Sequence, residues 1–305
     1  MPKPDSNQLT RRNFASGIAG LSLGLASTPA SAQLKIGLGP ISDIGRMLKT
    51  ISLDEDDEIS MGNDLFGPMI QATGGIYRNG PAQSSLIKFA STIFETSARS
   101  AFSWEIVIVD NNEVNAWALP GGKIALNKGI LRYVDSEDEL AAVISHEMGH
   151  AELSHAAKEM RKKAFYSGLS SAARTAAVSA VGDKARAGTN AGMQALSGPI
   201  MGLITSGYSR DLELEADLHI ANVFEKTGHD LGRGANFYQT LLDIIPTNSK
   251  GTTSLFAGHP ETVKRLALLQ EQSADMPSTG AGLNFEYFAL KQTFPTRHIY
   301  KRAAK

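Results

Sequence analysis

The segment His146-Glu147-Met148-Gly149-His150 holds the side chains of this chain that are best suited to chemistry. Residues four apart share one face of a helix, so both imidazoles can bind one metal ion. Glu147 then lies beside the ion, where its carboxylate can take a proton from a water molecule. Two exposed or core-packed histidines are the alternative, but the apolar, capped helix around the segment favours a metal site.

A hydrolytic zinc site usually has three protein ligands and a fourth position open to water. A third ligand from the same segment would require Gly and His where the chain has Leu153 and Ala156. His155 is five residues after His150, about 140° round a continuous helix. We therefore expect His155 to contact a ligand from behind or to lie at the surface, and we leave it out of the metal site.

A later acidic helix supplies the other candidates for the third ligand. Glu213 and Asp217 are four residues apart, so Glu213 can bind the ion while Asp217 accepts a hydrogen bond from the second nitrogen of a ligand histidine. Glu215 points about 200° away from Glu213 and has no partner at that spacing. We prefer Glu213 as the ligand, the alternative being a group of surface acids near the positive end of a helix.

Composition limits the classes of protein that the chain can belong to. Its 305 residues are 42% hydrophobic and 20% charged, which is typical of a globular protein. The 30 basic and 31 acidic residues give a formal charge of -1, which argues against a nucleic-acid partner. The absence of cysteine excludes disulfides, thiolate zinc sites and a cysteine nucleophile. No apolar run reaches the roughly 18 residues of a membrane-spanning helix.

Residues 1–32 have the layout of an export signal. Basic residues, including the pair Arg11-Arg12, precede a modest apolar run over 18–26 and a small-residue site that ends at Ala32. The arginine pair resembles a twin-arginine signal. An amphipathic first helix is the alternative, but each of its three glycines would cost about 1 kcal/mol relative to Ala. We predict cleavage after Ala32, leaving a metallopeptidase domain over residues 33–305 with its core at 82–273.

Periodicity predicts the elements that must position the site. We expect apolar helical spacing over 86–94, a helix capped by Ser136 and Glu139 ahead of the motif, a helix over about 211–226 ended by Gly228, and another from Pro260. Strands are expected at 106–109, 115–119 and 123–126, the last two joined by a Pro-Gly-Gly turn. The strand through Ala116 to Leu119 could present its backbone to an extended substrate.

Two further segments have less definite patterns. The acidic run over 54–58, within a mixed stretch from 33 to 80, is interpreted as a solvated face or loop without a binding role. Residues 164–207 are rich in Ala, Ser and Gly; we expect them to be helical, with a lid over the site as one option. The segment after Asp275 has no clear pattern.

The motif at 146–150 and the segment Ser209 to Asp217 together resemble family forty-eight of the metallopeptidases. Its members include the heat-shock protease HtpX, the CAAX prenyl proteases and the periplasmic beta-barrel assembly-enhancing protease. Three more segments match, namely Asn115 to Ile124, Gly129 to Leu131, and His259-Pro260 with Arg265 behind it. We therefore expect an α+β zincin-like domain of the gluzincin type, mainly helical with a small sheet beside the motif helix.

The resemblance also assigns roles. In the family, the residues corresponding to His146, His150 and Glu213 bind one zinc ion, and the residue corresponding to Glu147 is the catalytic base. The periplasmic members further nominate His259, either as a donor to the oxyanion or as a fourth zinc ligand that keeps the enzyme latent. A histidine that merely precedes the helix at Pro260 is the alternative.

The function implied by this resemblance is a periplasmic zinc endopeptidase that cuts unfolded or misfolded proteins in envelope quality control. Peripheral association with the outer membrane or its assembly machinery is expected, and nucleic acid is not. The membrane helices of HtpX and the prenyl proteases, and the helical-repeat module of the assembly-enhancing protease, have no counterpart here, so we expect a compact exported catalytic domain. The alternatives are a zinc-bearing chaperone or assembly factor with a self-blocked site, and a non-catalytic metal-binding module.

Overall fold

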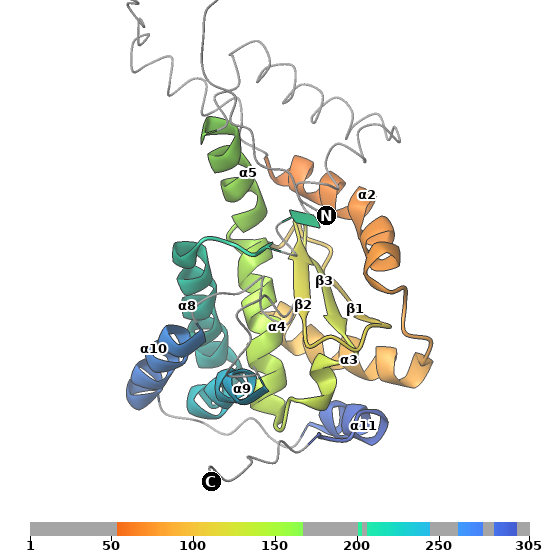
Figure 1. The fold of residues 1–305 in the computed structure, drawn as a ribbon, viewed down its shortest axis with the longest axis vertical. Helices are drawn as coiled ribbons and strands as arrows, with labels where there is room; N and C mark the ends of the chain where they lie inside the picture. Colours follow the sequence, from red (N-terminus) through yellow and green to blue (C-terminus); the bar gives the residue numbers. More distant parts are fainter. Residues whose placement is uncertain (1–53, 167–200, 203–205, 245–261, 277–283, 298–305) are drawn as a thin grey trace, which may run out of the picture. The chain divides into compact units, whose positions relative to one another are not determined.

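The computed structural model describes residues 54–166, 201–202, 206–244, 262–276 and 284–297. In these ranges the chain forms helices around a small sheet, as the predicted α+β class requires (Figure 1). The elements in chain order are α2 (Glu55–Thr73), α3 (Gly80–Phe94), β1 (Glu105–Val109), β2 (Ala116–Leu119), β3 (Lys123–Asn127), the 3-10 helix η1 (Ile130–Arg132), α4 (Glu137–Glu152), α5 (His155–Tyr166), α8 (Arg210–Thr227), α9 (Leu231–Ile244), α10 (Thr262–Asp275) and α11 (Phe285–Thr293). The predicted signal segment, residues 167–200 of the predicted lid, and the predicted helix start at Pro260 lie outside the described residues.

The sheet has the strand order β1-β3-β2. β1 runs parallel to β3, whereas β2 and β3 form an antiparallel hairpin across the predicted Pro-Gly-Gly turn. Gly121 and Gly122 have φ angles of 72° and 82°, a conformation that other residues rarely adopt, which explains why glycines stand in this turn. The three predicted strands are confirmed to within about one residue at each end.

The strand side chains alternate between two buried faces, which is why the strands have nearly continuous apolar sequences. One face packs on α2 and consists of Val107, Val109, Trp117, Leu119 and Ala125. The other face joins the main core with α3, α4, α8 and α9, and consists of Ile106, Ile108, Ala116, Ala118, Ile124 and Leu126. Within the described ranges, no helix is both long and apolar enough to cross a membrane.

Helix α4 is the central element, between the sheet on one side and α8 on the other (Figure 1). Ser136 caps it by accepting a hydrogen bond from the Glu139 backbone N–H at 3.2 Å, as predicted. In a capping box the Glu139 carboxylate would accept a hydrogen bond from the backbone N–H of Ser136. It accepts instead from the backbone N–H of Asp135, at 2.7 Å. All residues from Asp138 to Ala151 are buried, so the motif is held on a rigid internal helix.

Helices α2, α9 and α11 were not predicted, and α5 was not predicted as a helix separate from α4. The acidic run at 54–58 begins α2, where Asp54 and Asp57 form a capping box and negative charge favours the positive helix end. The expectation of a solvated face holds for Glu55 and Asp56, but Glu58 is buried. Helix α11 is short and partly exposed, so its sequence shows only a weak apolar stripe.

Gly149 sets the distance between α4 and α8. A Cβ atom added at this position would lie 3.0 Å from His219 Cβ and 3.2 Å from Ala216 Cα, both on α8. The two helices therefore touch almost backbone to backbone. This close approach brings Glu213 and Asp217 of α8 within reach of the histidines on α4.

We expect Gly149→Leu to force α8 away from α4 and lower the free energy of unfolding by about 1–3 kcal/mol through overpacking. The free energy of unfolding of Gly149→Ala should lie between those of Gly149→Leu and the wild type, because a single Cβ atom fits only tightly against α8. Chemical denaturation monitored by circular dichroism measures the change. Asn63→Leu on the exposed face of α2 is the control, with an expected change within about 0.5 kcal/mol. Wild-type stability of Gly149→Leu would contradict this account of the helix contact.

Candidate metal centre

Three potential ligands converge where α4 meets α8. His146 Nε2 and His150 Nε2 are 3.0 Å apart. Glu213 Oε2 lies 3.5 Å from His146 Nε2, and Glu213 Oε1 lies 3.5 Å from His150 Nε2. All three side chains are buried, and together they form a possible metal-ion site. The structure thus brings together the three residues that the sequence nominated as ligands.

The spacing and chemistry of these donors suit zinc. A tetrahedral site with bonds of about 2.0–2.1 Å places neighbouring donor atoms about 3.3–3.4 Å apart. The observed separations of 3.0 to 3.5 Å bracket this value. Two histidines with one glutamate and no thiolate are also a donor set found in hydrolytic zinc sites. The residues present therefore fit the ion that the sequence predicts.

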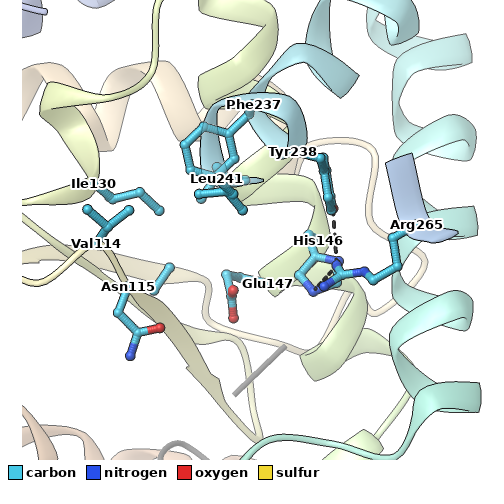
Figure 2. A pocket seen from close by; sticks show the side chains of 11 residues that line it. Val114, Asn115, Ile130, His146, Glu147, Phe237, Tyr238, Leu241 and Arg265 are labelled. Atoms are coloured by element: carbon cyan, nitrogen blue, oxygen red, sulfur yellow. Dashed lines mark hydrogen bonds between the residues drawn. The ribbon is translucent and has the colours of Figure 1, made fainter. Parts of the chain in front are cut away.

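The buried carboxylate of Asp217 holds the outer side of His146. Asp217 Oδ1 lies 3.0 Å from His146 Nδ1 and accepts a hydrogen bond from the Tyr238 hydroxyl at 2.8 Å. Arg265 donates from Nε to Oδ2 at 2.7 Å and from Nη2 to Oδ1 at 2.8 Å. Figure 2 shows the Arg265 guanidinium next to the His146 ring, with Tyr238 beside it. Asp217 thus has the position predicted for a residue that orients a ligand histidine.

Arg265 also contacts the ligands directly. Its Nη1 lies 2.9 Å from Glu213 Oε2, and its Nη2 lies 3.1 Å from His146 Nε2. Arg265 belongs to the segment around Pro260 that matches the family, but no role was predicted for it. Tyr238 had no sequence signal, because one tyrosine in an apolar helix is indistinguishable from a core residue.

The pKa values of this group reflect competition between burial and charge. Burial and the Arg265 charge disfavour protonated His146, but Asp217 and Glu213 outweigh them and raise the pKa of His146 to about 9. Burial alone would raise the pKa of Asp217, yet Arg265 and His146 lower it to about 2. A proton and a metal ion therefore compete for His146, which makes metal binding dependent on pH.

The second ligand histidine has different neighbours. Tyr208 stacks on the His150 ring with centroids 4.1 Å apart and planes at 16°. Burial and the nearby charges of Glu147 and Glu213 raise the pKa of Tyr208, which keeps its hydroxyl protonated at neutral pH.

His150 Nδ1 lies 2.8 Å from Nδ1 of His155, so His155 contacts a candidate ligand from behind, one of its two expected positions. Glu215, for which the sequence showed no partner, contacts His155 and Lys158 from α5.

Glu147 borders a small apolar pocket beside the ligand cluster. The pocket has a volume of about 40 Å³, and its apolar wall comes from Val114, Ala116, Ile130, Val143, Phe237 and Leu241. Figure 2 shows Glu147 between Asn115, which directly precedes β2, and His146. The carboxylate of Glu147, an apolar pocket and the beginning of β2 are therefore adjacent. His259, predicted as an oxyanion donor or fourth ligand, lies outside the described residues.

We expect Arg265→Gln to lower the free energy of unfolding by about 3–5 kcal/mol, because it leaves the buried Asp217 carboxylate without its cation. Arg233→Gln is the control, since Arg233 pairs with Asp138 through a side chain that is 60% exposed, and a change of about 0–1 kcal/mol is expected.

The same variant should change the acid sensitivity of the fold. The pKa of Asp217 is lowered in the folded chain, so its stabilisation is complete above the unfolded value near 4 and is lost as the pH falls towards about 2. Without Arg265 this pKa rises, and acid unfolding should begin at a higher pH. Denaturation curves at a series of pH values measure both effects; equal losses for the two arginine variants would refute a special role for Arg265.

Comparisons with known proteins agree with this geometry. The sequence model of Peptidase family M48 matches residues 82–273. The beta-barrel assembly-enhancing protease of Yersinia pestis is 27% identical over 88% of this chain and 55% of its own length. The metalloprotease YcaL of Escherichia coli is 24% identical over 74% of this chain and 84% of its own, and the mitochondrial metalloendopeptidase OMA1 of Schizosaccharomyces pombe is 25% identical over 85% and 73%.

The chain spans only about half the length of the assembly-enhancing protease that it matches. The family match nevertheless covers well over half of the chain and includes the motif helix, the sheet and the acidic helix α8. It confirms the resemblance found in the sequence, and several relatives carry the name of a metalloprotease. The chain belongs to peptidase family M48, a family of metallopeptidases.

Proposed function

We propose that this chain is a zinc-dependent endopeptidase in which His146, His150 and Glu213 hold one zinc ion and Glu147 is the general base. The observation that carries the proposal is the convergence of three buried donors, 3.0 to 3.5 Å apart, beside the buried carboxylate of Glu147, which lies on α4 together with both histidines. A buried cluster of this kind is costly unless it binds a cation or serves catalysis.

Zinc, when bound, supplies a Lewis acid that polarises the substrate carbonyl and makes water acidic enough to lose a proton near neutral pH. Glu147 would take this proton as the water attacks the peptide carbonyl. It would then donate the same proton to the departing amine as the peptide bond breaks, and so return to its ionised form. Asp217 Oδ1 lies 3.0 Å from His146 Nδ1, so a proton on Nδ1 would be bound by this carboxylate, and Nε2 would be the nitrogen whose lone pair binds the ion.

The surroundings of Glu147 support binding of an extended peptide. In the described part of the sheet, β2 pairs only with β3, and its other edge can accept backbone hydrogen bonds from a substrate strand. The pocket next to Glu147 has room for about three water molecules, or a small branched aliphatic side chain. We infer that one substrate residue beside the scissile bond is aliphatic. His259 remains our candidate for a donor to the oxyanion or for a blocking fourth ligand.

The cellular setting of the proposal rests on analogy. The Yersinia pestis relative is named for enhancing beta-barrel assembly, and residues 1–32 have the layout of an export signal. We propose a periplasmic enzyme that removes unfolded or misfolded envelope proteins, in peripheral association with the outer membrane or its assembly machinery.

Cleavage of casein by the full chain with one equivalent of zinc should depend on Glu147. We expect Glu147→Gln to reduce the rate about 10²- to 10⁴-fold while the fold and zinc binding persist, because the amide cannot accept the proton. Glu225→Gln on the exposed face of α8 is the control and should keep the wild-type rate. The rates are measured from gel or mass-spectrometric time courses.

Two other outcomes are informative. Equal cleavage by the wild type and Glu147→Gln would point to a contaminating protease and refute the mechanism. Zinc binding without cleavage by either protein would favour the alternative of a latent, zinc-bearing assembly factor.

Val143 provides a graded test of the aliphatic pocket, because it lies on α4 one turn before the motif and lines the cavity. Val143→Ala should shift casein cleavage towards bulkier apolar residues beside the scissile bond, and Val143→Leu towards smaller ones. Mass spectrometry of the peptide ends measures this preference. Val263→Ala is the control, since Val263 is exposed on α10 and away from the pocket. One unchanged preference across the Val143 series would show that the pocket does not bind substrate.

A further inference from the structure

His155 reaches the metal centre because the motif helix ends just before it. Helix α4 stops at Glu152, and Ser154 adopts a positive φ of 56°, which is unusual for a residue other than glycine. The Ser154 hydroxyl donates to Glu58 Oε1 of α2 at 2.7 Å, which anchors this turn. Helix α5 then begins at His155. The turn redirects the chain, so His155 faces back towards His150 rather than away from it, as it would on a continuous helix.

The contacts of His155 form a chain from the ligand to the surface. His155 is fully buried; its Nδ1 lies 2.8 Å from His150 Nδ1, and the two rings are at 73°. On its other side, His155 Nε2 lies 3.3 Å from Glu215 Oε2. Lys158 Nζ donates to the same oxygen at 2.6 Å, through side chains that are about 40% exposed.

These contacts determine where the protons lie when His150 is a ligand. Its Nε2 offers a lone pair to the ion, so the ring proton is on Nδ1. A contact between two Nδ1 atoms requires one donor and one acceptor, so His155 Nδ1 accepts this proton. The remaining proton of His155 is then on Nε2, where it faces the Glu215 carboxylate. One arrangement of protons therefore satisfies every contact.

We infer that His155, held by Glu215, is a positioning residue that fixes the tautomer and ring orientation of His150 for metal binding. The inference rests on the proposed function, because it concerns a ligand of the proposed zinc site. His155 contacts His150 at Nδ1, on the opposite side of the ring from the nitrogen that would bind zinc, His150 Nε2. Its other nitrogen contacts Glu215. His155 is therefore not itself a ligand. Groups in this position raise metal affinity by orienting the ligand that they contact.

Two amide substitutions separate this role from general packing. The Asn side chain can place its oxygen near the position of Nδ1, whereas the longer Gln side chain reaches the position of Nε2. His155→Asn therefore keeps an acceptor for His150, and His155→Gln keeps a polar group for Glu215 but loses that acceptor. The full chain is titrated with zinc at fixed pH in competition with a chromophoric chelator, and circular dichroism monitors the fold.

We expect His155→Gln to bind zinc about 10- to 100-fold more weakly than the wild type, and His155→Asn to stay within about threefold of it. Glu215 is the partly exposed partner of His155, so Glu215→Gln should also weaken zinc binding, but less than His155→Gln does. His229→Gln is the matched control, a buried histidine that contacts Asp138 at 2.8 Å and lies outside the metal centre, and its zinc affinity should be unchanged.

Wild-type zinc affinity in His155→Gln, or equal losses in His155→Gln and His155→Asn, would overturn the inference. If neither variant at 155 folds, Glu215→Gln decides, and an unchanged affinity in that variant overturns it. Failure of the proposed function would instead appear in the wild type, as absence of zinc binding or of Glu147-dependent cleavage. The two failures are therefore distinguishable.

Discussion

The buried ion pair between Asp217 and Arg265 ties the site together. Asp217 on α8 accepts hydrogen bonds from Arg265 on α10 and Tyr238 on α9, and it lies against His146 on α4. One carboxylate thus connects four helices at the point where the ligands meet. Removing a partner from such a pair leaves a charge buried in a medium of low polarity, so the four helices must keep this arrangement.

The two histidines proposed as ligands are held by different means. His146 contacts a carboxylate deep between helices, within a network that carries full charges. His150 contacts a second histidine, which links it through Glu215 and Lys158 to the surface. The contacts of His146 are rigid because side chains from four helices meet at Asp217. The contact of His150 with His155 depends instead on the turn at Ser154 and on its hydrogen bond to Glu58. Helix α2, remote in sequence from the motif, thereby supports one ligand.

The sequence predicted those features that local pattern determines. The motif spacing on α4, the i,i+4 pair on α8, the hairpin through Gly121 and Gly122 and the cap at Ser136 all follow from local rules, and each lies where it was expected. The contacts of Arg265 and Tyr238 could not be predicted, because they depend on how separate helices pack. For His155 the sequence left two positions open, because the break in the helix after Glu152 decides between them. A continuous helix was assumed at that point, and Glu215 was left without a partner, so the contact between His155 and Glu215 was not predicted.

The charge balance of the centre explains why these contacts belong together. Glu147, Glu213 and Asp217 are buried carboxylates, and among the described residues of the site Arg265 is the buried cation that faces them. With all three carboxylates ionised, three negative charges would face one positive charge, an excess that costs free energy in a buried site. A proton on His146, whose pKa is raised to about 9, removes one unit of this excess. A divalent ion between the three donors would remove both units, so that Glu147 could stay ionised and act as the proposed base. An excess of buried carboxylates over buried cations would therefore favour the binding of a divalent ion, as the proposed zinc site requires.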